Sequence, residues 1–355
     1  MNAHENDMMR IALFVSLLSL AGCTNATPAA TTTTTSAPSS TYLDNSGRDD
    51  VLSGGVKMIP ITTPKGTFHV WTKRVGNNPK IKLLLLHGGP GATHEFMEAF
   101  DSYLPKDGIE YYYYDQLGST YSDQPTDDSL WDLPRFVEEV EQVRTALGLS
   151  RDNFYLLGQS WGGMLAMEYA LKYQQNLKGL VISNMMASIP EYVRYAETVL
   201  MPAMDQKALA EIKKIEAAKD YKNPHYMELL VPNFYEQHIL RLPAAQWPDP
   251  VNRAFKHINE SIYVLMQGPS EMSASGRLEK WDRTADLSKI SVPTLVVGAR
   301  YDTMDPKHME MMASKVQKGR YLYCPNGSHL AMYDDQKTYM GGVVQFLRDV
   351  DGGKL

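Results

Sequence analysis

Short apolar runs separated by polar turns recur along most of the chain and predict the strands of one sheet. The first two runs look like a hairpin that turns at residues 64–66. The predicted strands are residues 56–62, 68–75, 81–86, 111–114, 153–157, 177–183, 294–297 and 320–324. Helical periodicity appears between several of them, as in Phe136, Val137, Val140 and Val143, and again over residues 339–350. This alternation predicts an α/β fold with a mostly parallel central sheet.

One long segment breaks the alternation. Residues 189–277 show helical patterns and many aromatic side chains but no convincing buried strand. We therefore expect a helical lid inserted into a core formed by residues 51–188 and 278–355.

The first fifty residues have a different composition from the rest of the chain. Arg10 precedes an apolar run at residues 11–20 that is too short to span a bilayer, so residues 1–22 are predicted to be a signal peptide. Residues 20–23, Leu-Ala-Gly-Cys, resemble a bacterial lipobox and predict lipidation of Cys23. Residues 23–50 contain many Thr, Ser, Ala and Pro residues and predict a disordered tether. The expected location is that of an exported bacterial lipoprotein anchored to a membrane, facing the periplasm or the cell surface.

Composition narrows the class of protein. The chain has 355 residues, of which 43% are hydrophobic, enough for a sizeable core. A net charge of −6 argues against a nucleic-acid partner. If Cys23 carries lipid, the second cysteine, Cys324, has no partner for a disulfide. No clustered metal ligands and no dinucleotide-binding fingerprint are found, so no metal and no cofactor are predicted.

The motif with the clearest chemistry is Gly158-Gln159-Ser160-Trp161-Gly162. It follows the apolar run 154–157 and precedes a helical stretch at residues 164–170, which is the context of a nucleophile elbow. A plain structural turn is the alternative interpretation. The context favours Ser160 as a catalytic nucleophile.

A serine nucleophile needs a histidine base and an acid that orients it. His329 lies on a loop after the last predicted strand, and Asp302 follows the strand before it. The order Ser, acid, His is that of α/β-hydrolases. Asp305 shares the acid's loop and is its main rival for that role, but Asp302 is preferred.

The tetrahedral intermediate of acyl transfer also needs N–H donors for its oxyanion. The backbone N–H of Trp161, directly after the nucleophile, is expected to be one. The strand 81–86 leads into His87-Gly88-Gly89-Pro90-Gly91, and Gly89 is the expected second donor. His87 is expected to orient this loop by hydrogen bonding.

Together these motifs resemble the proline iminopeptidase family of α/β-hydrolases, which includes the tricorn-interacting aminopeptidases. The resemblance covers residue 56 to the carboxyl end and rests on His87–Gly91, Asp115–Ser119, Gly158–Gly163, Gly268–Glu271, Asp302 and His329. It implies the α/β-hydrolase fold and a serine aminopeptidase of the prolyl type. Such an enzyme releases an amino-terminal residue, often proline, from short peptides.

The resemblance also implies how the substrate is bound. Family members hold the substrate's α-ammonium with carboxylates, and Glu271 matches the glutamate that the lid supplies. A second glutamate often follows the triad acid, but here that residue is Thr303, and Asp305 is the candidate substitute. The departure leaves open an L-amino-acid amidase acting on a small amide, or a general esterase. A surface lipoprotein that only binds its ligand is the alternative outside enzymes.

Overall fold

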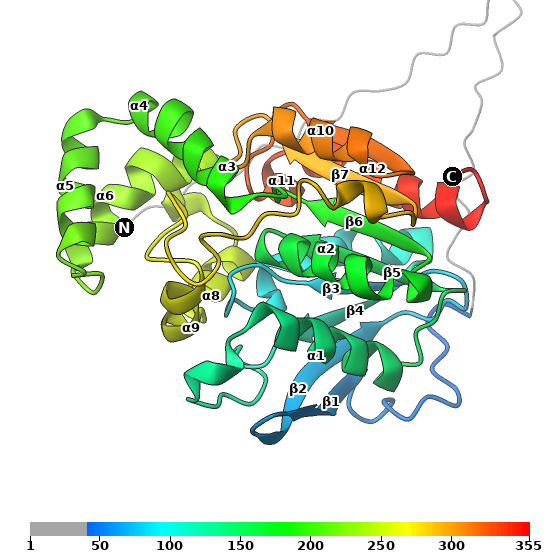
Figure 1. Ribbon diagram of the computed structural model, residues 1–355. Coiled ribbons are helices and arrows are strands. Elements are labelled where there is room, and N and C mark those ends of the chain that lie inside the picture. The colour runs from blue at the N-terminus through cyan, green and yellow to red at the C-terminus, as the bar shows by residue number, and fades with distance from the viewer. Residues whose placement is uncertain (1–40) are drawn as a thin grey trace, which may run out of the picture. The chain divides into compact units, whose positions relative to one another are not determined.

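The computed structural model describes residues 41–355 and contains one eight-stranded sheet (Figure 1). The strand order is β1-β2-β4-β3-β5-β6-β7-β8, in which β1, β2 and β4 pair antiparallel and the remaining pairs are parallel. The strands are β1 Val56–Thr63, β2 Gly66–Val75, β3 Lys82–Leu86, β4 Glu110–Asp115, β5 Phe154–Gln159, β6 Gly179–Ser183, β7 Thr294–Ala299 and β8 Gly319–Cys324. The eight predicted strands and the mostly parallel sheet are confirmed.

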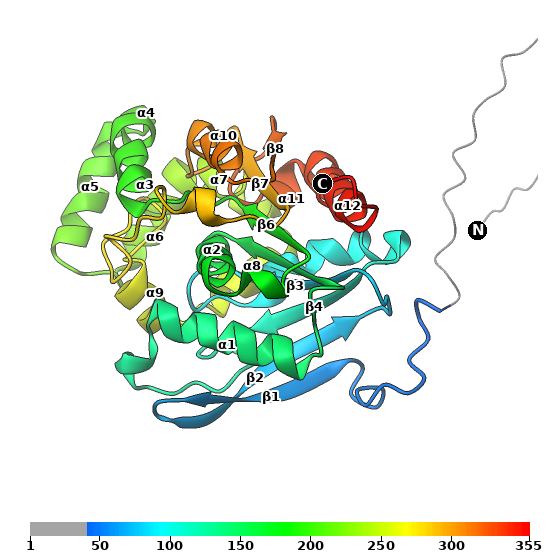
Figure 2. The ribbon, with the colours of Figure 1, turned by 45° about the vertical axis from the view of Figure 1, so that its right-hand side comes forward.

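The sheet is covered on both faces because its strands alternate apolar side chains between two cores. In β3, Leu84 and Leu86 join one core, whereas Leu83 and Leu85 join the other. The helices that complete the two layers are α1 Leu133–Ala146, α2 Trp161–Tyr173, α10 Pro306–Lys315, α11 Ala331–Asp334 and α12 Gln336–Asp351, with a 3₁₀ segment at His94–Ser102. Helices α1 and α2 lie side by side across one face (Figure 2).

The chain between β6 and β7 is helical, and within residues 189–277 the structure has no strand. Its helices are α3 Ile189–Tyr195, α4 Met201–Ala203, α5 Gln206–Ala217, α6 Pro224–Leu230, α7 Glu236–His238, α8 Asp249–Lys256 and α9 Glu260–Met266. Two π-helical segments, Ala196–Leu200 and Val231–Tyr235, adjoin α4 and α7. We call residues 189–277 the lid.

The start of the described chain corrects the predicted tether. Residues 1–40, including Cys23, lie outside the described residues, but residues 41–50 contact the core through Tyr42 and Asp50, the two buried residues among them. Tyr42 is only 3% exposed, and its hydroxyl donates to the carbonyl oxygen of Ile109 at 2.9 Å. Asp50 accepts two hydrogen bonds from Arg74, of 2.9 and 2.7 Å. The tether prediction was therefore wrong for residues 41–50, because composition does not reveal pairing with distant charges.

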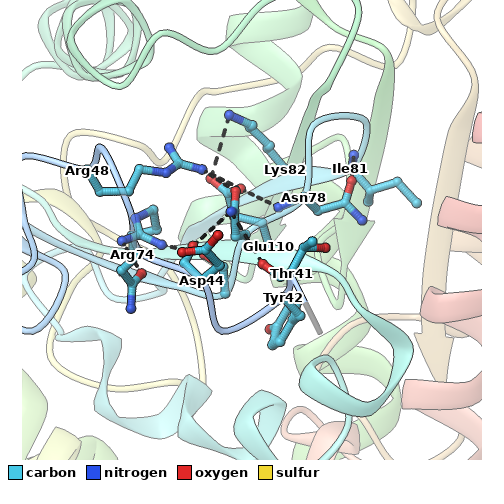
Figure 3. Close-up of polar contacts among 12 residues, drawn as sticks. Thr41, Tyr42, Asp44, Arg48, Arg74, Asn78, Ile81, Lys82 and Glu110 are labelled. Carbon is cyan, nitrogen blue, oxygen red and sulfur yellow. Dashed lines mark hydrogen bonds and ion pairs between the residues drawn. The ribbon is translucent and has the colours of Figure 1, made fainter. Parts of the chain in front are cut away.

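A second buried charge holds the same segment. Glu110, at the start of β4, is fully buried, and Figure 3 shows basic and amide groups converging on it. Its Oε2 accepts from Arg48 at 3.2 Å and from the backbone N–H of Asn78 at 2.6 Å, while Lys82 lies 3.7 Å from Oε1. Residues 41–55 thus supply Asp50 as a partner for the buried Arg74 and Arg48 as one of two cations beside the buried Glu110.

Deleting residues 41–55 is expected to lower the free energy of unfolding by about 3–5 kcal/mol, the usual cost of breaking a buried ion pair. The variant that starts at Val56 leaves Arg74 without Asp50 and Glu110 without Arg48. Urea unfolding of this variant and of one that starts at Thr41 measures the difference. Leu52→Ala is the control, since Leu52 is fully exposed. Equal unfolding midpoints for the two lengths would show that the segment does not stabilise the core.

Candidate active site

The turn between β5 and α2 places Ser160 in a strained conformation. Its backbone has φ 56° and ψ −126°, in a region that side chains rarely adopt. Glycines make the turn possible. A Cβ at residue 158 would lie 1.9 Å from the carbonyl oxygen of Gly162, and one at residue 162 would lie 2.2 Å from that of Leu86. The sequence motif therefore folds as the strand–turn–helix that a nucleophile elbow requires.

Asp302 and His329 meet beyond the carboxyl ends of β7 and β8. His329 Nδ1 lies 2.7 Å from Asp302 Oδ1, and both side chains are buried. The other carboxylate oxygen, Oδ2, accepts from Asn184 Nδ2 at 2.7 Å. Oδ1 also accepts from the backbone N–H of Met304 at 3.1 Å and from the Thr303 hydroxyl at 3.3 Å. The carboxylate is thus fixed by several donors in a position that orients the imidazole.

The surroundings of His329 suit it to accept a proton. Burial alone would lower the pKa of His329, but the charge of Asp302 and its hydrogen bond to the ring outweigh burial, and the pKa is raised above its usual value. His329 and Ser160 line the same cavity. Within residues 41–355 no hydrogen bond joins their side chains, and such contacts often tighten only when a substrate binds.

The glycine loop after β3 is held by His87, as the sequence analysis expected. His87 Nδ1 donates to the carbonyl oxygen of Gly88 at 2.8 Å, while Nε2 accepts from the backbone N–H of Gln116 at 3.1 Å. Burial lowers the pKa of His87, which favours the neutral ring that this pattern needs. Gly89 lies on the same cavity as Ser160. The motif that begins at Asp115 therefore supports the loop, and Trp161 Nε1 donates to Gln116 Oε1 at 2.8 Å.

The cavity that contains Ser160 is lined by residues of both the core and the lid. Its lining is mostly apolar, as in sites for small organic ligands. The lining residues are Gly88, Gly89, Ala92, Phe96, Gln159, Ser160, Ile239, Ala254, Phe255, Ile258, Tyr263, Glu271, His329 and Leu330. We call it the larger cavity. Among the described residues, Glu271 is the one with a carboxylate in this lining.

Three buried tyrosines from the lid hold Glu271 in place. The Tyr263 hydroxyl donates to Glu271 Oε1 at 2.5 Å, and the Tyr192 hydroxyl donates to the Glu271 carbonyl oxygen at 2.5 Å. The backbone N–H of Glu271 donates to the Tyr235 hydroxyl at 3.3 Å. One hydrogen bond thus orients the carboxylate, and two hold the backbone of the loop that carries it.

A second, smaller cavity of about 10 Å³ also borders Ser160. It shares Ser160 and Glu271 with the larger cavity but does not include His329. Its remaining lining residues are Trp161, Met164, Met185, Ile189, Tyr192, Gln267, Leu278 and Met304. Methionine side chains adapt to a ligand's shape, so the space can widen when a ligand enters.

The structure does not bring Asp305 into either cavity. Asp305 caps the amino end of α10, where its Oδ1 accepts from the backbone N–H of Lys307 at 2.9 Å. Asp305 was the candidate replacement for the second ammonium-binding carboxylate, but its side chain caps the helix instead. Thr303, which occupies the usual position of that carboxylate, is buried and contacts the triad, with Oγ1 3.3 Å from His329 Nδ1.

Several residues of the site were not predicted from the sequence. Asn184 directly follows β6, so its place at the carboxyl edge of the sheet was a usable signal. Tyr192, Tyr235 and Tyr263 come from three separate helical segments, and their convergence on Glu271 is a tertiary property. Within residues 41–355, no group of three or more His, Cys, Asp or Glu side chains is placed to hold a metal ion.

Comparisons with known proteins agree with this geometry. Residues 82–336 match the family model described as alpha/beta hydrolase fold. The chain is 65% identical over 296 residues to a proline iminopeptidase of Elizabethkingia meningoseptica, covering 83% of this chain and 98% of the relative. It is 63% identical to a proline iminopeptidase of Flavobacterium johnsoniae, covering 84% of this chain and the whole of the relative.

A solved structure of a proline iminopeptidase is also similar to this chain. The crystal structure of a proline iminopeptidase from Mycobacterium smegmatis superposes with a TM-score of 0.74 at 27% identity, covering 84% of this chain and all of that one. The fold, the elbow and the two high-identity relatives lead to one conclusion: the chain belongs to the proline iminopeptidase family of α/β-hydrolases.

Proposed function

We propose that this chain is a serine aminopeptidase that releases amino-terminal proline from short peptides through an acyl-enzyme. The observation that carries the proposal is the cavity itself, in which a serine on an elbow, a histidine paired with a buried aspartate and a fixed lid carboxylate face one space. The high-identity relatives named proline iminopeptidases support the choice of substrate.

In the acylation step, Ser160 Oγ attacks the carbonyl carbon of the first peptide bond while His329 Nε2 takes the hydroxyl proton. Asp302 holds the Nδ1–H of the ring and stabilises the imidazolium that forms. The backbone N–H groups of Gly89 and Trp161 are the proposed donors to the oxyanion. His329 then returns the proton to the leaving amine, and the C–N bond breaks.

Deacylation reverses the roles. A water molecule attacks the ester carbonyl, its proton passes to His329 Nε2, and the ring gives that proton to Ser160 Oγ as the ester C–O bond breaks. The products are free proline and a peptide shortened by one residue. The side chains of this chain and one water molecule account for every atom and proton transferred in the two steps.

The two cavities divide the substrate between them. His329 protonates the leaving amine, so the rest of the peptide belongs in the larger cavity, which His329 lines. The first residue then occupies the smaller methionine-lined cavity, and its ammonium pairs with Glu271, which both cavities share. Such an ion pair fixes the register, so that only the first peptide bond reaches Ser160.

Replacing Glu271 with glutamine is expected to lower kcat/KM for prolyl-p-nitroanilide by about 30-fold to 1,000-fold, the loss typical of removing one partner of a close charge pair. Asp305→Asn is the matched control. Asparagine is also a good helix cap, so this variant should keep the wild-type rate. Steady-state kinetics on both variants measure the effect. A large loss in Asp305→Asn with little change in Glu271→Gln would show that Asp305, and not Glu271, recognises the amine.

One observation favours an alternative activity, that of an L-amino-acid amidase. Thr303 stands where the family often has a second glutamate, and amino-acid amides need no room for a peptide beyond the first residue. An L-amino-acid amidase would use the same serine, histidine and Glu271. Rates on prolinamide and on prolylglycine distinguish the two activities. The relatives do not favour the esterase alternative, and a purely binding role leaves the complete set of catalytic groups unexplained.

We also propose that the enzyme is exported and anchored by lipid on Cys23. The support comes from sequence alone, namely the apolar run 11–20 and the lipobox-like residues 20–23. None of the helices in the described chain is long and apolar enough to cross a membrane. Labelling cells with radioactive palmitate tests the anchor: the full chain should take up label, and Cys23→Ala should not. Equal labelling of both would refute it.

A further inference from the structure

Gln267 lines the smaller cavity together with Glu271, and neither the catalytic mechanism nor the ammonium ion pair uses it. Gln267 directly follows α9 and is 7% exposed. Its backbone N–H donates to Tyr263 at 2.8 Å, and its carbonyl oxygen accepts from Ser275 at 2.9 Å and Gly276 at 3.0 Å. The residue is therefore fixed at the base of the loop that carries Glu271.

One contact orients the carboxamide of Gln267. Gln267 Nε2 lies 3.5 Å from the carbonyl oxygen of Ser273, a long contact in which only the amide nitrogen can be the donor. The amide oxygen Oε1 consequently points away from Ser273. No hydrogen bond from residues 41–355 reaches Oε1. Oε1 is not among the fully buried unpaired side-chain atoms of the described chain, so it keeps some exposed surface where a ligand or water can donate to it.

The chemistry of the cavity indicates what that ligand is. Glu271 carries the one carboxylate in the lining of the two cavities, among the described residues. Its Oε1 already accepts from Tyr263, and within the described chain no hydrogen bond reaches Oε2. Two acceptors on residues that line the same cavity as Ser160, Glu271 Oε2 and Gln267 Oε1, thus have no hydrogen bond within the described chain. A prolyl amino terminus is a secondary ammonium with two N–H bonds, so the numbers of donors and acceptors match.

We propose that Gln267 is the second anchor of the substrate's ammonium, supplying a neutral amide oxygen where the family often supplies a second carboxylate. The inference rests on the proposed aminopeptidase function and deepens it. Glu271 provides the charge, and Gln267 takes the second N–H and sets the direction of the pyrrolidine ring. The substrate class that this pair fits is a peptide whose first residue carries a secondary amine.

The test compares an amine substrate with an amine-free one. In Gln267→Met, which keeps the size but removes the acceptor, kcat/KM for prolyl-p-nitroanilide should fall about tenfold to 100-fold, mainly through KM, as expected for a lost hydrogen bond to a charged group. Hydrolysis of p-nitrophenyl acetate, which has no ammonium, should stay within about twofold because the catalytic groups are untouched. Gln267→Glu keeps an acceptor oxygen and should retain the rate on the prolyl substrate.

The outcomes separate this inference from the function on which it rests. An equal loss on both substrates in Gln267→Met, or no loss on either, overturns the anchor role of Gln267. If Gln267→Met does not fold, a tenfold or greater fall in prolyl hydrolysis by folded Gln267→Glu overturns it instead. Failure of the proposed function appears in the wild-type enzyme, which would then cleave prolyl-p-nitroanilide and its N-acetylated form equally well or cleave neither.

Discussion

Replacing Ser160 with alanine is expected to lower kcat for prolyl-p-nitroanilide by about 10⁵-fold to 10⁶-fold, the loss seen when a serine hydrolase loses its nucleophile. Ser160 Oγ is the atom that would form the acyl-enzyme, and Ser160 is the one residue with a hydroxyl in the elbow sequence Gly158–Gly162. Steady-state assays at high enzyme concentration measure the residual rate.

The fold should survive this substitution, because alanine occupies the same strained turn with a smaller side chain. Thermal unfolding of Ser160→Ala checks that expectation, and Ser53→Ala, a change at an exposed serine, is the kinetic control. Activity within about tenfold of the wild type in a folded Ser160→Ala variant would contradict the assignment of the nucleophile.

Asp302→Asn is expected to reduce kcat by about 10⁴-fold, since an amide in this position favours the wrong tautomer of the histidine. The effect should be large here because Asp302 Oδ1 lies 2.7 Å from His329 Nδ1 and the pair is buried. The amide can still contact its neighbours, so the fold should be kept. Kinetics and thermal unfolding of the purified variant measure both quantities.

The same substitution should change the pH dependence of kcat/KM. In the wild type the pKa of His329 is raised above 6.5, so activity falls as the pH drops through that higher value and the base becomes protonated. Burial opposes the shift, and Asp302 causes it. Without the carboxylate, the acid limb of the residual activity should move to lower pH. An acid limb that stays in place would show that Asp302 does not set the pKa of the base.

The sheet and the elbow could be predicted because their signals are local. Each strand is a short apolar run, and the spacing of Gly158, Ser160 and Gly162 follows directly from the clash that any Cβ would cause. The two loops with Asp302 and His329 follow parallel strands, whose carboxyl ends necessarily meet at one edge. Local pattern and topology together were therefore enough to bring these residues together.

Other features depend on partners far apart in the sequence. Arg74 and Asp50 form a buried ion pair that no composition reveals, so the segment before β1 was misjudged as part of a tether. The sequence also does not show where a loop side chain points. Asp305 caps helix α10, although it lies only three residues from Asp302. The three tyrosines that form hydrogen bonds with Glu271 come from separate helical segments of the lid, and the sequence does not show how these segments are arranged in space.

The measurement that tests the central claim most directly compares kcat/KM of the wild-type enzyme for prolyl-p-nitroanilide and for its N-acetylated form, with Ser160→Ala as the blank. Acetylation removes the charge that Glu271 is proposed to bind and leaves the scissile bond unchanged. We predict that cleavage of the free prolyl substrate is at least about 100-fold faster, as expected for loss of a close charge pair. Equal cleavage of the two substrates would contradict the account, because the enzyme would then not recognise the amino terminus.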